Sequence, residues 1–394
     1  MRFPEFSGEW KREKLKNISS FYSGGTPSIN NKKYWNGQIP FISASTMHDF
    51  IISSSNQHLT QEGLNHGSKL LKRGNLLLLV RGSMLWNKIP VCYNQVDVAF
   101  NQDVKGIILN DKSYTMFLLY WFYAHEKRIK YMVTGTGIGA GKLDTDDLLS
   151  LKIAYPDEAE QKKITILLSL LDERIATQNK IIDRLESLIK GLNNDFHNNN
   201  GDITTTFTAF GEAYSGLSGK NADSFGSGKP YITYLNVYQN NYINKNQYDY
   251  VTISDGEKQS KVSSGDILFT LSSETPNEVG IGSVYLGNDK ELYLNSFCFG
   301  VHIKNNNVIY PPYMAHLVSS QYFRKAIYPL AQGSTRFNLQ KNDFMKKTFI
   351  LPSLEKQKQI SKVLNSLSEK DNIEKQQLAL LQAERLYLLR QMFI

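Results

Sequence analysis

A glycine-rich run that ends in a lysine is the first feature of the chain that could bind a phosphate. It is Gly135-Thr-Gly-Ile-Gly-Ala-Gly141-Lys142. A Walker A loop needs a glycine five positions before its second glycine, and a serine or threonine after the lysine. Those positions hold Thr136 and Leu143, and no strong β-α-β unit follows for a dinucleotide fingerprint. We interpret the run as a loop that approaches a nucleic-acid backbone or base.

Two further motifs are similar to catalytic motifs, but neither has the groups in the arrangement that the chemistry needs. Tyr310-Pro-Pro-Tyr313 is similar to the Asn/Asp-Pro-Pro-Tyr motif of amino-methyltransferases. That chemistry needs a first residue that accepts a hydrogen bond from the target amine, and Tyr310 is a poor acceptor. We instead predict that the two prolines open a helix. Asp157, Glu160 and Lys162 resemble a nuclease set, but they lie together at a helix start, where no separate strand could hold the acids around a metal.

The histidines show no spacing typical of metal ligands. They are His48, His58, His66, His125, His197, His302 and His316. No Ser/His/Asp or Cys/His set stands out either. The chain is therefore expected to have no catalytic site, no metal and no cofactor of its own.

Composition sets the broad class of the protein. The 394 residues suggest two to three domains, and 41% hydrophobic content is enough for real cores. The net charge of +8 permits a nucleic-acid partner without requiring one. Two distant cysteines exclude a disulfide scaffold and fit a reducing compartment. Without a long apolar run or a signal peptide, a soluble cytoplasmic protein with no membrane contact is expected.

The sequence repeats itself once, at an offset of 196 residues. Pro156, Gln161 and Ile164 align without a gap with Pro352, Gln357 and Ile360, and further glycine, leucine and aspartate matches lie just upstream. Weaker matches continue upstream at offsets of 190 to 194. A repeat of this length predicts two similar halves, each a globular part followed by a helix.

The globular parts are predicted to be mixed α/β (α+β) and rich in strands. Short apolar runs bounded by Gly, Pro, Asn and Ser predict strands at 39–42, 76–80, 104–109, 231–235, 267–271 and 299–303. Helices are predicted at 116–131 and after Pro311, and the Asn-rich residues 193–201 are predicted to be a linker. The expected order is domain 1 at 1–155, helix 1 at 156–196, domain 2 at 197–351 and helix 2 at 352–394.

Both helical segments carry a heptad, which predicts a coiled-coil seam. The seam residues that we predict are Ile164, Leu168, Leu171, Ile175, Gln178, Ile182, Leu185, Ile189 and Leu192 in the first helix, and Ile360, Leu364, Leu367, Leu378, Leu381 and Leu388 in the second. Equivalent helices pair most simply in an antiparallel way. Gln178 would then lie near Asp371 and Glu374 as a polar layer that fixes register. The alternative is that the two acids simply face solvent.

Positive charge is concentrated in the first domain. Residues 1–156 hold 19 basic and 12 acidic residues, which gives +7, whereas residues 197–352 hold 13 and 12, which gives +1. This asymmetry favours a polyanion near the first domain, with more polar contacts from the second.

The organisation resembles the specificity subunit of Type I restriction–modification enzymes over essentially the whole chain. The motifs that carry the resemblance are the Arg-Phe-Pro-Glu-Phe-Ser-Gly-Glu-Trp10 opening, Ser23-Gly-Gly-Thr-Pro27, Arg81-Gly-Ser83, Asn101-Gln102, Gly333-Ser-Thr-Arg-Phe-Asn-Leu339 and the two Pro…Gln-x-x-Ile helices. Gly139-Ala-Gly-Lys142 and Gly216-Leu-Ser-Gly219 depart from the family's pattern.

The resemblance implies two target-recognition domains, each binding one half of a bipartite, asymmetric double-stranded DNA target, with the helices as a spacer. It implies two methyltransferase subunits that carry S-adenosylmethionine, and restriction subunits that use ATP and Mg. We predict DNA contacts at Thr26, Lys32, Lys33, Arg81 and Lys142 in domain 1 and at Lys220, Thr275, Arg336 and Asn338 in domain 2. Two other functions stay open: a coiled-coil scaffold that does not recognise DNA, or a self-contained methyltransferase or nuclease.

Overall fold

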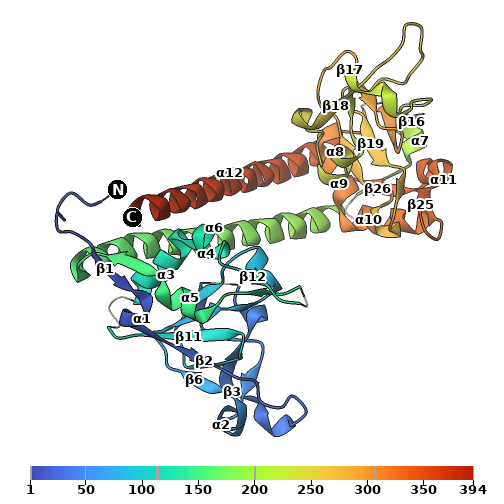
Figure 1. Cartoon of the computed structure of the whole chain (residues 1–394). Coiled ribbons are helices and arrows are strands. Elements are labelled where there is room, and N and C mark those ends of the chain that lie inside the picture. Colours follow the sequence, from blue (N-terminus) through green and yellow to red (C-terminus); the bar gives the residue numbers. More distant parts are fainter. Residues whose placement is uncertain are drawn as a thin grey trace. The chain divides into compact units, whose positions relative to one another are not determined.

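The computed structural model describes residues 2–48, 50–111, 115–137, 139–198, 201–305 and 307–393. The chain divides into two compact units (Figure 1). Unit 1 is Met1–Asn179 with Gln377–Ile394, and unit 2 is Lys180–Gln376. Both boundaries fall inside long helices, α6 (Glu158–His197) and α12 (Leu354–Met392). Each unit therefore combines one globular domain with part of each helix.

Unit 1 is built on two larger sheets and two smaller ones. The five-stranded sheet has the order β2 (Ser19–Ser23), β11 (Val104–Leu109), β7 (Leu76–Leu79), β9 (Val91–Asn94), β4 (Ile51–Ile52). The four-stranded sheet has the order β5 (His58–Leu59), β3 (Trp35–Ile42), β10 (Val98–Phe100), β6 (Lys69–Leu71). The smaller sheets are β12 (Thr134–Gly135), β13 (Gly141–Lys142), β8 (Arg81–Gly82), and the pair β1 (Lys11–Lys14), β14 (Lys152–Tyr155).

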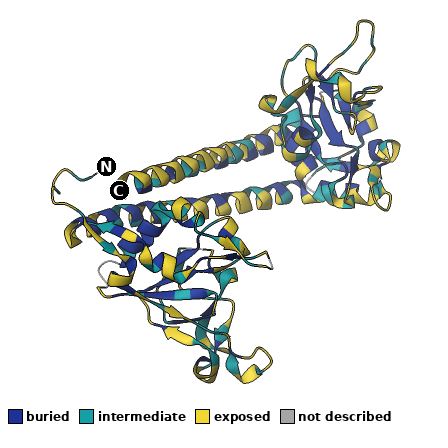
Figure 2. Cartoon of the chain, in the orientation of Figure 1, coloured by how far each residue is buried: buried dark blue, intermediate teal, exposed yellow. Residues whose placement is uncertain are grey.

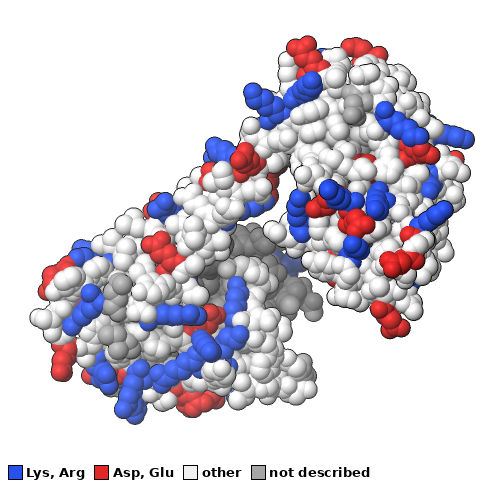
Figure 3. All heavy atoms as spheres, turned by 90° about the horizontal axis from the view of Figure 1, so that it is seen from above, with Lys and Arg blue, Asp and Glu red and all other residues white. Residues whose placement is uncertain are grey.

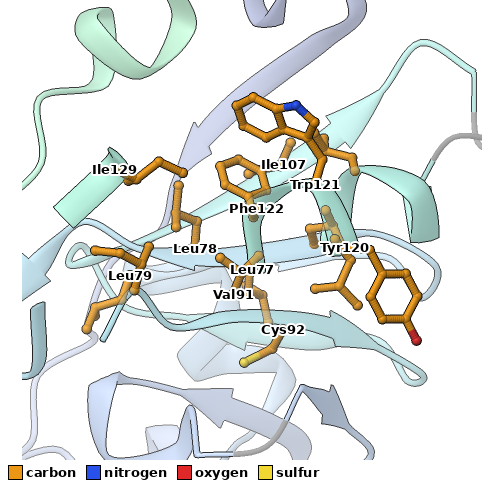
Figure 4. Close-up of a cluster of buried hydrophobic side chains, with 14 of the residues drawn as sticks. Leu77, Leu78, Leu79, Val91, Cys92, Ile107, Tyr120, Trp121, Phe122 and Ile129 are labelled. Atoms are coloured by element: carbon orange, nitrogen blue, oxygen red, sulfur yellow. The ribbon is translucent and has the colours of Figure 1, made fainter. Parts of the chain in front are cut away.

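The core of unit 1 forms around β7, whose four leucines are buried on both faces of the sheet (Figures 2 and 4). The helix α3 (Thr115–Ala124) contributes Tyr120, Trp121 and Phe122 to the same core (Figure 4). The single helix predicted at 116–131 is wrong, because α3 ends and α4 (Glu126–Lys130) begins at His125. The His125 ring stacks on Trp121 and contacts the Trp121 carbonyl through Nδ1 at 2.9 Å.

Unit 2 repeats the topology of unit 1. Its sheets have the orders β16 (Gly211–Ser215), β23 (Cys298–Ile303), β19 (Ile267–Thr270), β21 (Gly282–Val284); β18 (Tyr248–Val251), β17 (Phe225–Ile232), β22 (Tyr293–Leu294); β24 (Ala331–Gln332), β25 (Phe337–Leu339), β20 (Ser272–Ser273); and β15 (Ile203–Thr205), β26 (Phe349–Leu351). These orders match those of unit 1 except for counterparts of β4 and β6. The predicted duplication is therefore confirmed for every strand of unit 1 except these two.

Short helices complete both units. In unit 1 they are α1 (Leu15–Ile18), α2 (Gln61–Gly67) and α5 (Thr145–Ser150), with 3-10 turns η1 (Lys32–Tyr34), η2 (Ala44–Thr46) and η3 (Ser83–Trp86). In unit 2 they are α7 (Phe207–Phe210), α8 (Tyr234–Gln239), α9 (Pro311–Ser319), α10 (Gln321–Ile327) and α11 (Lys341–Lys346), with 3-10 turns η5 (Ala222–Ser224), η6 (Lys245–Gln247), η7 (Pro276–Glu278) and η8 (Tyr328–Leu330). The strand predicted at 231–235 ends early, because the Thr233 hydroxyl caps α8 by accepting from the Asn236 amide. The helix predicted after Pro311 is confirmed as α9, with prolines in its first turn.

The repeated Pro…Gln motif forms the same hydrogen bond at the start of each long helix. The Gln161 amide donates to the Pro156 carbonyl at 2.8 Å, and the Gln357 amide donates to the Pro352 carbonyl at 2.9 Å. Both glutamines are buried. Each side chain therefore satisfies a carbonyl that the turn into the helix would otherwise leave buried and unpaired.

Within each unit, early residues of one long helix pack with late residues of the other. In unit 1, Ile164 and Leu168 share a core with Leu389 and Met392. In unit 2, Leu192 packs against a core that contains Ile360 and Leu364. Both pairings are antiparallel, as predicted. All of the predicted seam residues are buried or half-buried.

The polar seam positions are also buried, at 6% exposure for Gln178 and 7% for Asp371. The alternative in which Asp371 faces solvent is therefore wrong. Its carboxylate is paired with Lys375 one turn later at 2.8 Å, which gives the buried charge a partner. The polar layer that would join Gln178 to these acids stays a prediction.

The predicted linker at 193–201 is partly wrong. Helix α6 continues to His197, because Asn193 is held inside unit 2, where its amide donates to the His316 carbonyl at 3.1 Å. Residues 199 and 200 lie outside the described residues. Across the part of the chain that the structure describes, no helix combines the length and the apolarity that crossing a bilayer requires.

Candidate DNA interface

Basic side chains are distributed differently over the two units. On the visible face of unit 1, Lys and Arg form a nearly continuous band, whereas on unit 2 they alternate with acids (Figure 3). The ion pairs of unit 2 explain the second pattern. The described lysines of unit 2 that pair with acids are Lys220 with Glu257, Lys229 and Lys261 with Glu291, Lys245 with Asp289, Lys304 with Glu212, and Lys375 with Glu186 and Asp371. The positive charge of unit 1 is thus more available to a polyanion.

Two of the predicted contact residues in unit 1 are brought together by strand pairing. Arg81 on β8 and Lys142 on β13 are direct cross-strand partners, although they are 61 positions apart in the chain. Both side chains are exposed. Like charges opposite each other are unfavourable in a free sheet, and an anion between them would relieve this repulsion. Lys142 also lies 3.7 Å from Asp144, in a pair that is about half exposed and therefore weak.

The glycine-rich run is a connection between the adjoining strands β12 and β13, not a phosphate loop. A Cβ at Gly141 would lie 2.9 Å from Val133 Cγ1 and 3.0 Å from Leu85 Cβ, so a larger residue does not fit there. The indole of Trp86, which is 46% exposed, donates to the Gly139 carbonyl at 3.0 Å. The Trp86 ring on η3 therefore lies against the connection that leads into Lys142.

The other predicted contacts of unit 1 lie on the segment that leads into β3. Lys32 and Lys33 are exposed on η1, where the Asn31 side chain caps the turn by accepting from the Lys33 amide at 3.1 Å. Among the described residues, no ion pair involves either lysine. Thr26 is also exposed, and its hydroxyl donates to Gln102 at 2.8 Å. The capped turn thus presents two adjacent ammonium groups on a fixed backbone.

Replacing Lys32 and Lys33 with glutamine should weaken binding to every DNA sequence by a similar factor. Each lysine that neutralises a phosphate contributes about 0.9 to the slope of log affinity against log salt, so the slope should fall by about 2. Binding isotherms at several salt concentrations measure this slope. The matched control is Lys127 and Arg128, an adjacent exposed pair on α4. A loss confined to one DNA sequence would mean instead that these lysines contact bases.

Unit 2 has neutral residues at the two positions that correspond to Arg81 and Lys142 of unit 1. Ser272 on β20 and Asn338 on β25 are the corresponding cross-strand partners. The exposed Arg336 lies on the turn between β24 and β25, and its Nε donates to the Ser272 hydroxyl at 3.1 Å. Thr275 is exposed at the start of η7, and its amide donates to the Ser273 hydroxyl at 3.4 Å. Arg336, Asn338 and Thr275 therefore gather around one strand, β20.

Lys220 does not belong to this group. Its ammonium donates to the Thr252 carbonyl at 2.7 Å and to Glu257 at 2.6 Å, and its side chain is only 9% exposed. Hydrogen bonds from Lys220, Gln259 and the Ser254 amide together lower the pKa of the Glu257 carboxyl to about 2, with that from Lys220 the largest cause, so Glu257 stays ionised. The lysine ties two loops together, so we correct the prediction and leave Lys220 out of the interface.

Sequence inspection missed a pocket beside Arg336. It has a volume of about 380 Å³ and is lined by Tyr234, Leu235, Tyr238, Ser272, Ser273, Glu274, Glu278, Phe297 and Arg336. Phe297 is 49% exposed, and the Arg336 guanidinium lies 5.1 Å from the centre of its ring. The pocket combines a cation, two acids and aromatic walls. The one signal in the sequence was the pair of tyrosines at 234 and 238, one helical turn apart.

No group of three or more His, Cys, Asp or Glu side chains that could hold a metal ion occurs among the described residues. Tyr310 caps α9, and Tyr313 is buried in the core of unit 2.

Comparisons with known proteins agree with this architecture. The family model described as "Type I restriction modification DNA specificity domain" matches residues 7–187 and 190–383. The EcoR124I/EcoR124II specificity subunit of Escherichia coli is 32% identical over 174 residues, which are 44% of this chain and 43% of that protein. The MjaVIII specificity subunit of Methanocaldococcus jannaschii is 23% identical over 95% of this chain and 91% of its own.

Solved structures show the same fold. The Type I restriction–modification S subunit from M. genitalium matches this chain with a TM-score of 0.61 at 16% sequence identity. The match covers 100% of this chain and 99% of that one. The aligned part of this chain spans less than half of the first two curated relatives, 43% and 42% of their lengths.

Proposed function

Because the chain belongs to the family of Type I restriction–modification DNA specificity domains, we propose that it is the specificity subunit of such a complex. The observation that carries the proposal is the duplication of one recognition domain, each copy followed by a long helix of an antiparallel pair. Each domain would bind one half of a bipartite, asymmetric DNA target. The chain would act in the cytoplasm and leave catalysis to its partners.

The two halves would be recognised by different physical means. Unit 1 would depend on phosphate attraction through Lys32, Lys33, Arg81 and Lys142, and unit 2 on polar and aromatic side chains. Half-sites recognised from one face of the duplex lie about 10 bp apart or a multiple of that. The helices, which are shared by both units, would set the unread gap between the half-sites.

The partners would be two methyltransferase subunits, which carry S-adenosylmethionine, and restriction subunits, which use ATP and Mg. Helix α12 supports a docking role because it exposes apolar side chains at intervals of seven residues: Ile373 at 55%, Leu380 at 71% and Tyr387 at 53%. Helix α6 exposes Ile181 and Leu188 at the same spacing. A heptad of exposed apolar residues is typical of a helix surface that binds another protein.

Replacing Leu380 with glutamate should prevent the methyltransferase subunit from co-purifying with this chain. The side chain is exposed, so the chain itself should fold with unchanged stability. The control is Gln382→Glu, which adds the same charge at an exposed position outside the heptad. Size-exclusion chromatography of the co-expressed subunits measures the complex. Equal complex formation by Leu380→Glu and the wild type would contradict a docking role for this surface.

The function itself is tested by co-expressing the chain with its neighbouring methyltransferase subunit and mapping N6-methyladenine across the host genome by long-read sequencing. The expected result is a new split motif, with two short defined halves around a fixed gap. Absence of new methylation despite a complex that co-purifies would argue for a scaffold that does not recognise DNA. Methylation or cleavage by the isolated chain would argue for a self-contained enzyme.

A further inference from the structure

The pocket in unit 2 is lined by one cation, Arg336, and by two acids, Glu274 and Glu278. It lies between α8, β20, η7 and the turn between β24 and β25. Within the described residues, no ion pair of 4.0 Å or less joins Arg336 to Glu274 or to Glu278. The pocket volume of about 380 Å³ falls within the range of about 300 to 1,000 Å³ that is typical of ligand pockets.

Arg336 is held in place while most of its donors stay available. Its Nε donates to the Ser272 hydroxyl, and its guanidinium lies over the Phe297 ring. Among the described residues, no acceptor binds its two terminal amino groups. A guanidinium fixed by its inner nitrogen presents the outer fork of donors that matches two acceptors side by side.

Glu278 is held by hydrogen bonds as an acceptor in the same pocket. Its Oε1 accepts from the Tyr238 hydroxyl at 2.7 Å and its Oε2 accepts from the Ser273 hydroxyl at 2.8 Å. The Tyr238 hydrogen bond is the main reason that the pKa of this carboxyl lies below its usual value. Thr275 is a third hydrogen-bond partner of this side chain, and a carboxylate has about four accepting positions, so accepting capacity remains. Glu274, by contrast, is exposed at the rim.

The base pair that combines these two requirements is G·C. In the major groove, guanine presents O6 and N7 as adjacent acceptors, and cytosine presents its N4 amino group as a donor. An A·T pair would offer its amino group beside N7 on the same base, and a single arginine fork does not match that pattern. The aromatic walls, Tyr234, Tyr238 and Phe297, would exclude water from the contact.

We propose that this pocket recognises a G·C base pair in the second half of the DNA target, with Arg336 donating to guanine and Glu278 accepting from the N4 amino group of cytosine. The inference rests on the proposed function, which says that unit 2 binds one half-site. It adds which base pair that half-site contains and which two residues select it.

The test uses the full chain in complex with its methyltransferase subunit and a library of DNA duplexes with both half-sites randomised. The wild type should select G·C at one position of a half-site. Arg336→Lys keeps the charge but removes the fork, and Glu278→Gln keeps the shape but removes the charge. Each should reduce selection at that position by about 10-fold or more. Selection in the other half-site should not change. Glu355→Gln, at an exposed position of unit 2 outside the pocket, is the control and should behave like the wild type. Glu274→Gln tests whether the other acid of the pocket is the one that selects.

Several outcomes would overturn the inference. One is a selected motif without G·C in the half-site affected by Arg336→Lys. Another is selection of G·C that survives both substitutions, and a third is loss of selection in Glu274→Gln alone. These outcomes leave the proposed function intact, because the other half-site is still selected. If the wild type selects no sequence in either half, the proposed function fails and the inference fails with it. The wild-type motif tests the inference even if a variant does not fold.

Discussion

Replacing Arg385 with methionine should lower the free energy of unfolding of unit 1 by about 3 kcal/mol. Arg385 on α12 is paired with Asp172 on α6, whose side chain is only 3% exposed. Asp172 also accepts from the Tyr120 hydroxyl of α3 at 2.8 Å. The substitution leaves the carboxylate buried without its countercharge. Removing one member of a buried pair costs about 3 to 5 kcal/mol, and the lower end applies because the Arg385 side chain is 23% exposed.

The measurement can be confined to the correct unit. All four tryptophans lie at positions 10, 35, 86 and 121, within unit 1, so intrinsic fluorescence during urea unfolding monitors that unit. The matched control is Arg390→Met, which removes the same charge from an exposed position on the same helix. A second variant, Asp172→Leu with Arg385→Leu, should recover part of the loss, because no buried charge then remains. Equal midpoints for Arg385→Met and the control would show that the pair does not stabilise the fold.

Replacing Arg81 and Lys142 together with glutamine should reduce DNA affinity by about 30- to 100-fold at low salt, and should lower the salt slope by about 2. The stability of unit 1, in contrast, should increase. The two side chains are cross-strand partners of the same charge, so their removal should raise the stability of unit 1 by a few tenths of a kcal/mol. Fluorescence anisotropy with a labelled duplex measures binding, and thermal unfolding measures stability.

The chain provides a control with the same geometry and charge. Lys14 on β1 and Lys152 on β14 are also exposed cross-strand partners in unit 1. Replacing both with glutamine removes the same two charges from another sheet. DNA affinity should fall much less in this variant. If both double variants lose affinity equally, the effect comes from net charge, and the proposed position of the interface is wrong.

The sequence predicts the duplication, the long helices and their seam, because each appears as a repeat or a periodic pattern of residues along the chain. A heptad needs only its own residues, and each predicted seam position from Ile164 to Leu192 is buried or half-buried in the fold. The repeated Pro…Gln motif has a local cause too, since the Gln161 side chain binds a carbonyl five residues away. The same holds for α9, where Pro311 at the helix start was enough to predict the element.

Failures of prediction occurred where a distant segment decides a residue's environment. Lys220 is predicted to contact DNA, but the fold brings Glu257 to within 2.6 Å of its ammonium group. The charge of Lys220 is therefore neutralised inside the unit. Helix α6 continues through Asn193 because a carbonyl from α9 accepts its amide. Neither partner is visible in the neighbouring sequence.

The amino-acid sequence by itself determined the two-fold repeat, the coiled-coil seam and the concentration of positive charge in the first domain, because composition and periodicity are properties of the chain. Only the tertiary structure decided which charges stay available and which side chains meet. Arg81 and Lys142 become neighbours through strand pairing, and Tyr238, Glu278, Phe297 and Arg336 surround one pocket although they span 98 positions. Such groupings depend on distances through space, which a linear pattern does not contain.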